Sequence, residues 1–224
     1  MQEKKFIAVG DIHGCAKTLE LMLDELDEYD QRVFIFMGDY IDRGPDSCKV
    51  IDLLLEFEED HECIWLRGNH EQMLLDALDG GDYSVWLYNG GEMTINSYIR
   101  KYGSFDLPFE HEIFYKDTSL YYDTPDFFFV HAGLNPQRTI KESLKKEKYM
   151  QEFLWERSHL YSSETKWEKK VVFGHTPMPE PLVGDKMIGI DTGCVYGSSR
   201  GYGILTAVKI PELSFIQKNC IDNI

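Results

Sequence analysis

The sequence has little positive charge for its length. Lysine and arginine together number 23 among 224 residues, against 39 acidic residues, so the formal net charge is −16. Proteins that bind duplex or single-stranded nucleic acid present a basic face to the phosphates. We therefore expect no nucleic-acid partner. Any phosphate binding must depend on positive charge gathered at one place, and bound metal ions are the simplest source of it.

Cysteine motifs, long apolar runs and linkers are also missing. The five cysteines are widely spaced and form no Cys-x-x-Cys pair, so we expect a reduced, cytoplasmic chain without disulfides or a zinc ribbon. No apolar run approaches the roughly 20 residues that span a bilayer, and the start of the chain lacks the pattern of a signal peptide. No Pro/Ser-rich linker, repeat or low-complexity tract divides the sequence. We expect one domain over residues 1–224, no membrane contact and no obligate partner.

What is present is a series of short apolar runs that end in small polar clusters. Such runs predict buried strands, here at 6–9, 33–37, 63–66, 127–130 and 171–173. Further strands are expected at 113–122, 186–191, 203–210 and 213–217. Apolar residues at helical spacing predict helices near 19–26, 50–58 and 71–78. The alternation of strands and helices indicates βαβ units, and an α/β domain with two packed sheets accounts for the whole pattern.

Some segments and residues carry weaker signals. The segments 81–112 and 137–168 look irregular and helical, and no motif indicates their role. Their aromatic residues Tyr83, Trp86 and Tyr88 could line a substrate groove, although core packing is the preferred interpretation. Cys15 and Cys194 are expected to be small buried residues. Asp191, after a predicted strand, is expected to form a turn, with support of a ligand histidine as the alternative.

The polar clusters carry side chains of one chemical kind. Because they follow strands of an open α/β fold, they are expected to meet at one edge, and they supply Asp11, His13, Asp39, Asn69, His131 and His175. Oxygen and imidazole donors without a thiolate suit Mn, Fe or Zn in a catalytic site. Each cluster alone would more simply be a turn or a buried histidine. Six donors together are about right for two ions that share a bridging carboxylate.

Five motifs resemble those of a known family. Gly-Asp-Ile-His-Gly at 10–14, Gly-Asp-Tyr-Ile-Asp-Arg-Gly at 38–44 and Gly-Asn-His-Glu at 68–71 are similar to the three signature motifs of the phosphoprotein phosphatase family of calcineurin-like metallophosphoesterases. His-Ala-Gly at 131–133 and Gly-His-Thr at 174–176 resemble its two later histidine motifs. The resemblance covers about residues 5 to 210 and is closest to the small bacterial and phage enzymes. It implies the metallophosphoesterase fold, two packed mixed β-sheets flanked by helices in an αββα sandwich.

The resemblance also implies a role for each motif residue. One metal site would consist of Asp11, His13, Asp39 and His175, and the other of Asp39, Asn69 and His131, with Asp39 bridging the ions. His70 would be the general acid, oriented by Asp42, and Arg43 would bind the phosphoryl group. Arg157 of Leu-Trp-Glu-Arg (154–157) is similar to the second arginine of the family, with a plain surface arginine as the alternative.

Elementary chemistry agrees with these roles. Two divalent ions outweigh the charges of Asp11 and Asp39, so the site would be positive and could stabilise a phosphoryl group. Water that bridges two ions loses a proton readily and can attack phosphorus directly, without a phosphoenzyme. A carboxylate at Asp42 would favour the imidazolium form that a general acid requires. Arginine offers a planar fork that matches phosphate oxygens.

The main prediction is a metal-dependent serine/threonine protein phosphatase-like hydrolase, with manganese favoured and iron or zinc as alternatives. The enzyme alternative is a dinucleoside polyphosphate (Ap4A-type) hydrolase with the same metal centre. The symmetrical type of that enzyme typically lacks a counterpart of Asp42 and has aspartate in place of Glu71, which favours a phosphatase here. Phosphorylated small molecules remain open as substrates. A non-catalytic phosphate-binding module is the third possibility, but it predicts eroded motifs and none is eroded. The sequence leaves the oligomeric state and the physiological substrate undetermined.

Overall fold

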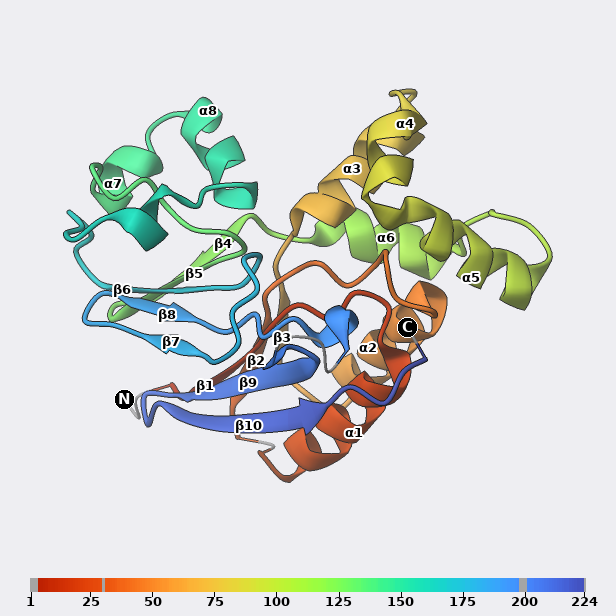
Figure 1. Ribbon diagram of the computed structural model, residues 1–224, viewed down its shortest axis with the longest axis horizontal. Helices are drawn as coiled ribbons and strands as arrows, with labels where there is room; N and C mark the ends of the chain where they lie inside the picture. Colours follow the sequence, from red (N-terminus) through yellow and green to blue (C-terminus); the bar gives the residue numbers. More distant parts are fainter. Residues whose placement is uncertain (1–3, 30, 198–200, 224) are drawn as a thin grey trace.

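Two mixed β-sheets pack face to face at the centre of the structure (Figure 1). The computed structural model describes residues 4–29, 31–197 and 201–223. The first sheet has the strand order β10-β9-β1-β2-β3, formed by β1 (Phe6–Val9), β2 (Val33–Phe36), β3 (Cys63–Trp65), β9 (Ile204–Ile210) and β10 (Ser214–Asn219). The second sheet has the order β4-β5-β6-β8-β7, formed by β4 (Tyr121–Asp123), β5 (Phe127–Val130), β6 (Lys170–Phe173), β7 (Leu182–Val183) and β8 (Met187–Gly189).

The strand sequences are apolar at successive positions because both faces of each sheet are covered. In β1, Phe6 and Ala8 face the second sheet and pack in one buried cluster with Phe129 and Ile188. Ile7 and the other alternate residues of β1 point the opposite way, toward the helices. This alternation follows from the two-residue period of a strand. Phe128 and Val171 of the second sheet likewise face a third cluster on its outer side.

Helices complete the outer layers. On the outer face of the first sheet lie α1 (Ala16–Leu26), η1 (Asp27–Tyr29) and α2 (Ser47–Glu58). A helical group beyond β3 contains α3 (Asn69–Leu78), α4 (Tyr83–Trp86), η2 (Leu87–Gly91), α5 (Glu92–Tyr102) and α6 (Phe109–Asp117). Short helical turns over the second sheet are α7 (Ile140–Ser143), α8 (Glu147–Met150), η3 (Gln151–Leu154) and η4 (Ser158–Tyr161), and η5 (Cys194–Tyr196) follows β8. The predicted αββα architecture is confirmed.

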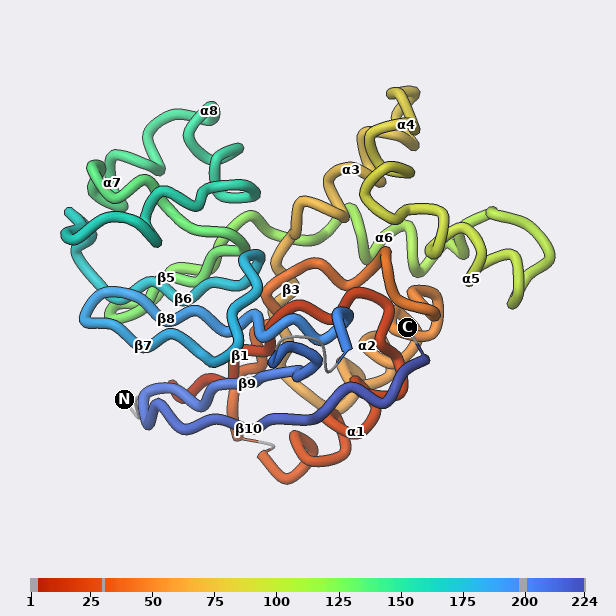
Figure 2. Tube along the Cα trace, viewed as in Figure 1, coloured from red at the N-terminus to blue at the C-terminus, as the bar shows by residue number. Residues whose placement is uncertain are grey.

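β1 lies between two partners that are far apart in sequence. It pairs in parallel with β2 and antiparallel with β9. Figure 2 shows the blue trace of residues 204–219 running beside the red trace of the first strand. The carboxyl end of β1 is therefore fixed from both sides, and the chain enters the polar loop 10–14 from a rigid strand.

One predicted strand is wrong. Residues 113–122 were expected to be extended, but the chain is helical in α6 and only β4 is a strand. The β-favouring residues Phe114 and Tyr115 are buried together with His111, at the three- and four-residue spacing of a helix face. Pro108 precedes the helix and acidic residues occupy its first turn, both of which favour helix initiation. Tertiary burial of this face therefore overrides strand propensity.

The expected burial of two cysteines and three aromatic residues is partly confirmed. Cys15 and Cys194 are buried, and so is Trp86, which belongs to the core beside the first sheet. Tyr83 and Tyr88 were expected to pack in the core, but they are exposed, Tyr88 by 93%. The one-turn helix α4 buries only Trp86, and η2, which contains Tyr88, buries only Gly91. Within the described residues, every helix is too short or too polar to cross a bilayer.

Candidate metal centre

The loops that follow five parallel strands meet at one place between the two sheets. β1 and β2 of the first sheet lead into loops that carry Asp11 and Asp39, and β3 leads to Asn69 at the start of α3. β5 and β6 of the second sheet lead into His131 and His175. Together with His13 these residues are at most 7% exposed. The sequence-predicted donors are therefore brought together, and we call this group the carboxylate–imidazole centre.

The backbone at this place is unusual. Among the described residues, the non-glycine residues with positive φ are His13, Asp39, Asp42, Arg43, His175 and Leu213, with φ between 48° and 72°. All but Leu213 belong to the predicted site. A left-handed conformation costs a non-glycine residue roughly 1–2 kcal/mol, and such strain gathers at functional sites. The strained backbone therefore lowers the stability of the fold and, in return, directs these side chains toward the centre.

Glu71 holds the segments that follow β2 and β3 together through hydrogen bonds. Its carboxylate accepts hydrogen bonds from the backbone N–H groups of Asp39 (2.8 Å), Tyr40 (2.9 Å) and Gly68 (2.9 Å). Gly68 is required in this arrangement, because a Cβ there would lie 2.1 Å from Asp39 Oδ1. Burial raises the pKa of Glu71 to about 7, with the charge of Asp39 as a further cause. Glu71 thus locks the loops that hold Asp39 and Asn69.

Two of the histidines have a defined orientation. Nδ1 of His13 lies 2.8 Å from the carbonyl oxygen of Ile41, and Nδ1 of His131 lies 2.8 Å from that of Met37. A carbonyl oxygen can only accept, so each Nδ1 carries hydrogen and donates. In the neutral ring the lone pair is then on Nε2, which faces the centre. Outer hydrogen bonds of this kind fix the orientation of metal-binding histidines.

The donor atoms crowd around Asp39. Its two carboxylate oxygens lie 3.4 Å from Nε2 of His13 and 3.4 Å from Nε2 of His131. His131 Nε2 also lies 3.1 Å from Asn69 Oδ1 and 3.2 Å from Nδ1 of His175. Asp11 joins them by accepting the backbone N–H of His175 at 3.0 Å. Asp39 is the residue shared by two clusters of ligand-type atoms that lie within 4.8 Å of one another.

The electrostatics of the centre fit cations. Burial raises the pKa of Asp11, and burial followed by the charge of His131 lowers the pKa of His175 to about 2. Burial would also lower the pKa of His131, but Asp39 raises it to about 9. The carboxylate of Asp39 therefore favours positive charge beside it in this buried place. The lone pairs of these donor atoms repel one another at such short distances, and cations bound between them would remove that repulsion. The donor set therefore fits divalent ions.

His70 and Asp42 form a fully buried pair beside these donors. Nδ1 of His70 lies 2.6 Å from Oδ2 of Asp42, and neither side chain is exposed. Asp42 also accepts from Trp86 Nε1 at 2.9 Å and from Thr94 Oγ1 at 2.6 Å. Burial raises the pKa of Asp42, and its contact with His70 opposes this. Nε2 of His70 lies 4.0 Å from Asp39 Oδ2 and is without a hydrogen-bond partner in the described structure.

The two predicted phosphate-binding arginines lie at the rim. Arg43 donates to Nε2 of His13 (2.8 Å) and to the hydroxyl of Tyr196 (3.3 Å). Arg157 is exposed, as the alternative of a surface residue requires, but its Nε donates to Thr176 Oγ1 (3.2 Å), next to His175. Both guanidinium groups therefore lie within reach of the carboxylate–imidazole centre.

The structure adds residues that the motifs did not indicate. Trp86 and Thr94 hold Asp42 but belong to the segment 81–112, where the sequence gave no signal. Trp155 stands edge-on to His175, with ring centroids 5.9 Å apart. The motifs also gave no structural role to Glu71, although its place three residues after a glycine at a helix start is typical of a capping residue. Asp191 forms the expected turn, accepting the Gly193 N–H at 2.9 Å.

The fold and the centre define a metallophosphoesterase. A family model described as calcineurin-like phosphoesterase matches residues 4–205, and the chain belongs to this family. The expectation of a metal-dependent phosphoester hydrolase is thereby confirmed, and divalent ions are the cofactors of such enzymes.

Two proteins of known name are similar to this chain over nearly their whole length. A protein of Oceanobacillus iheyensis named bis(5′-nucleosyl)-tetraphosphatase PrpE [asymmetrical] is 31% identical, over 95% of this chain and 91% of its own length. A protein of the same name from Halalkalibacterium halodurans is 26% identical, over 95% and 92%. Both of these relatives are thus named for hydrolysis of a dinucleoside tetraphosphate.

Solved structures show the same fold. A crystal structure of a candidate diadenosine tetraphosphatase aligns with a TM-score of 0.70 at 23% identity, covering 96% of this chain and 94% of the other. A serine/threonine phosphatase from Saccharomyces cerevisiae aligns with a TM-score of 0.65 at 18% identity, covering 99% and 81%. One architecture therefore serves enzymes described with both kinds of substrate.

Proposed function

We propose that this chain hydrolyses dinucleoside polyphosphates asymmetrically, dividing a dinucleoside tetraphosphate into a nucleoside triphosphate and a nucleoside monophosphate. The observation that carries the proposal is the similarity of nearly the whole chain to relatives named for this activity. Asp42 and Glu71 argue only against the symmetrical type of enzyme, so both residues are compatible with asymmetrical hydrolysis. Phosphoprotein hydrolysis becomes the second candidate, supported by the five motifs and the fold.

The rim of the centre offers support for a substrate with two bases. Trp155 lies beside His175 and is 46% exposed, and Tyr196 lies beside Arg43 and is 43% exposed. Exposed aromatic rings stack on nucleobases with roughly 1–3 kcal/mol for each base. Two such rings next to a phosphate-binding centre suit a molecule that carries a base at each end of a polyphosphate chain.

The chain's own residues perform the binding and the proton transfer. Asp11, His13, Asp39, Asn69, His131 and His175 would hold two divalent ions, manganese first among the candidates. The ions, when bound, activate water and neutralise charge on the phosphoryl oxygens. Arg43 and Arg157 would bind the flanking phosphate oxygens through their planar forks.

His70 would protonate the leaving oxygen. Because Nδ1 is engaged by Asp42, Nε2 is the atom that can deliver a proton. Its lack of any other partner in the described structure leaves it available for that contact. The burial of the pair excludes water, which strengthens the hydrogen bond between them.

A direct comparison of substrates tests the proposal. The manganese-loaded protein is assayed with diadenosine tetraphosphate and with a phosphothreonine peptide, and the nucleotide products are separated by chromatography. We expect a higher kcat/KM for the dinucleotide, with ATP and AMP as products. ADP alone would indicate the symmetrical reaction, and a preference for the peptide would restore the phosphoprotein substrate. Asp39→Asn, which should abolish turnover of both, is the control for a contaminating hydrolase.

A further inference from the structure

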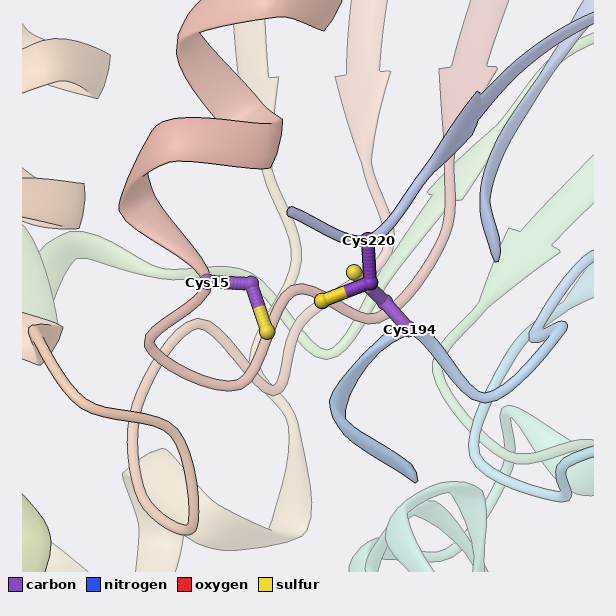
Figure 3. A group of neighbouring side chains, drawn as sticks. All are labelled: Cys15, Cys194 and Cys220. Atoms are coloured by element: carbon purple, nitrogen blue, oxygen red, sulfur yellow. The ribbon is translucent and has the colours of Figure 1, made fainter. Parts of the chain in front are cut away.

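Three cysteines outside the carboxylate–imidazole centre lie together. Cys15 stands at the start of α1, Cys194 begins η5 and Cys220 follows β10. Their sulfur atoms all lie within 4.8 Å of one another. Figure 3 shows the three side chains pointing into the same space from three separate segments. We call them the thiol cluster.

The backbone around the cluster is fixed independently of the thiols. The Cys15 N–H donates to the carbonyl oxygen of Ile12 at 3.2 Å, and the Cys220 N–H donates to that of Gly203 at 2.7 Å. Beyond Cys220, the carboxylate of Asp222 accepts the N–H groups of Lys17 and Thr18 at the start of α1. The thiols are thus held in place by local structure, and a ligand would meet a largely preformed site.

The cluster combines a dry interior with one accessible side. Cys15 and Cys194 are 0% and 2% exposed, and Cys220 is half-buried. Cys15 and Cys194 therefore close the interior of the cluster, and the half-buried Cys220 lies on the side from which a cation can enter.

Three converging sulfurs suit a metal better than a disulfide. A disulfide joins two sulfurs about 2.05 Å apart and leaves the third unused. Sulfurs that share one tetrahedral ion at a bond length of about 2.3 Å lie roughly 3.8 Å apart, which the cluster reaches with movements of about 1 Å or less. Thiolates select soft cations such as Cu⁺ and Zn²⁺, whereas the carboxylate–imidazole centre also suits harder ions.

We propose that Cys15, Cys194 and Cys220 form a second metal site, which binds one thiophilic cation of the Zn²⁺ or Cu⁺ type through three thiolates. The site joins the segment that follows β10 to two segments beside the proposed active site. Cys15 follows the loop of His13, and Cys194 precedes Tyr196, which contacts Arg43. Occupancy would therefore stabilise both segments without supplying a group to the reaction.

Cadmium is the probe, because thiolate ligation gives an ultraviolet charge-transfer absorption that oxygen and imidazole ligands do not give. Cd²⁺ is titrated into the full-length protein kept reduced. We expect an absorption that saturates at one equivalent with the intensity of three thiolates. In Cys220→Ser the intensity should fall by at least about a third and the affinity by at least about tenfold, which is the loss that even an outer-shell change can cause.

Cys63→Ser is the matched control, since Cys63 is also half-buried but lies in β3. Its absorption should equal that of the wild type, and circular dichroism verifies that both variants are folded. Mass spectrometry of the alkylated wild-type protein gives a readout without mutation, because Cd²⁺ should protect the half-buried Cys220 and leave the half-buried Cys63 reactive. Absence of the absorption, or an equal absorption in Cys220→Ser, would overturn the proposal. So would a metal-free disulfide within the cluster in protein purified without reductant.

Discussion

At the scale of single residues, Asp42 has the most crowded surroundings in the site. It is fully buried, and it contacts His70, Trp86 and Thr94 through hydrogen bonds. Two of these partners hold the carboxylate in place, and the third receives its orientation from it. A neutral side chain of the same shape would keep much of the packing but lose the charge that supports a cationic imidazole.

Asp42→Asn should therefore impair proton donation more than binding. We expect kcat to fall about 10²-fold for an alkyl phosphate, which needs protonation of its leaving group, and much less for an aryl phosphate, in line with the 10²- to 10⁴-fold contribution of general acids. Steady-state kinetics with both esters provide the measurement. Equal losses on the two substrates would contradict the role of His70 and Asp42.

Trp155 provides a second test at this scale. Trp155→Ala should raise KM for diadenosine tetraphosphate by about fivefold or more, because one stacking contact of roughly 1–3 kcal/mol is lost. It should leave kcat/KM for a small aryl phosphate nearly unchanged. Tyr161→Ala, which removes an exposed ring on η4, is the control. An unchanged KM for the dinucleotide would exclude Trp155 as a base-binding residue.

At the scale of elements, α1 depends on a residue far away in sequence. Cys15 occupies its N-cap position without capping through its side chain. Asp222 supplies the cap instead, accepting from Lys17 N (3.1 Å), Thr18 N (3.0 Å) and Thr18 Oγ1 (2.6 Å). A carboxylate at this end also complements the helix dipole. The helix that follows the His13 loop is thus tied to the segment after β10.

Asp222→Ala should lower the free energy of unfolding by about 1 kcal/mol, the usual effect of losing an N-cap, and Asp222→Asn should lower it by less. Urea denaturation at neutral pH measures both. Asp82→Ala is the matched control, because Asp82 caps the one-turn helix α4 through Ser84 N. Asp82→Ala should lower the free energy of unfolding by less than Asp222→Ala does. An equal decrease in the two alanine variants would show that Asp222 contributes no more than an ordinary local cap.

The elements also show where sequence reasoning succeeds and fails. Strands such as β1 and β2 were predictable because they are short, apolar and followed by motif residues, and the motifs located the donors around Asp39. The α6 helix was not predictable from propensity, since the burial of Phe114 and Tyr115 depends on partners from other elements. Trp86 and Thr94 were missed for the same reason. Their contact with Asp42 is a tertiary relation without a sequence pattern.

At the scale of the whole molecule, the stability depends on groups that must remain uncharged. His159 is fully buried, and both its ring nitrogens lack partners in the described structure. It packs edge-on against Phe173, with ring centroids 4.6 Å apart. Burial lowers the pKa of His159 to about 4, against 6.5 for the exposed group. Between these two pH values the unfolded chain binds a proton that the folded chain does not bind.

Stability should consequently fall as the pH falls from about 6.5 toward 4, by about 1.4 kcal/mol for each pH unit from this residue. His159→Phe should remove that contribution. The free energy of unfolding of the variant, relative to the wild type, should therefore improve by about 2 kcal/mol between pH 7 and pH 5. Urea denaturation of both proteins at the two pH values measures this change. The effect of the substitution on packing is the same at both pH values, so it cancels in the comparison. An unchanged difference would show that burial does not lower the pKa of His159.

The position of β1 between β2 and β9 has a consequence for the order of events during synthesis. β1 is translated nearly two hundred residues before its partner β9 (Ile204–Ile210). Until then β1 is an open edge, which is a risk for aggregation and a target for chaperones. Gly10, which precedes Asp11, donates its N–H to Thr206 of β9 at 2.9 Å. The backbone next to Asp11 therefore gains this support only after β9 has been synthesised, and we expect the metal centre to be loaded only after the last strands of this sheet have formed.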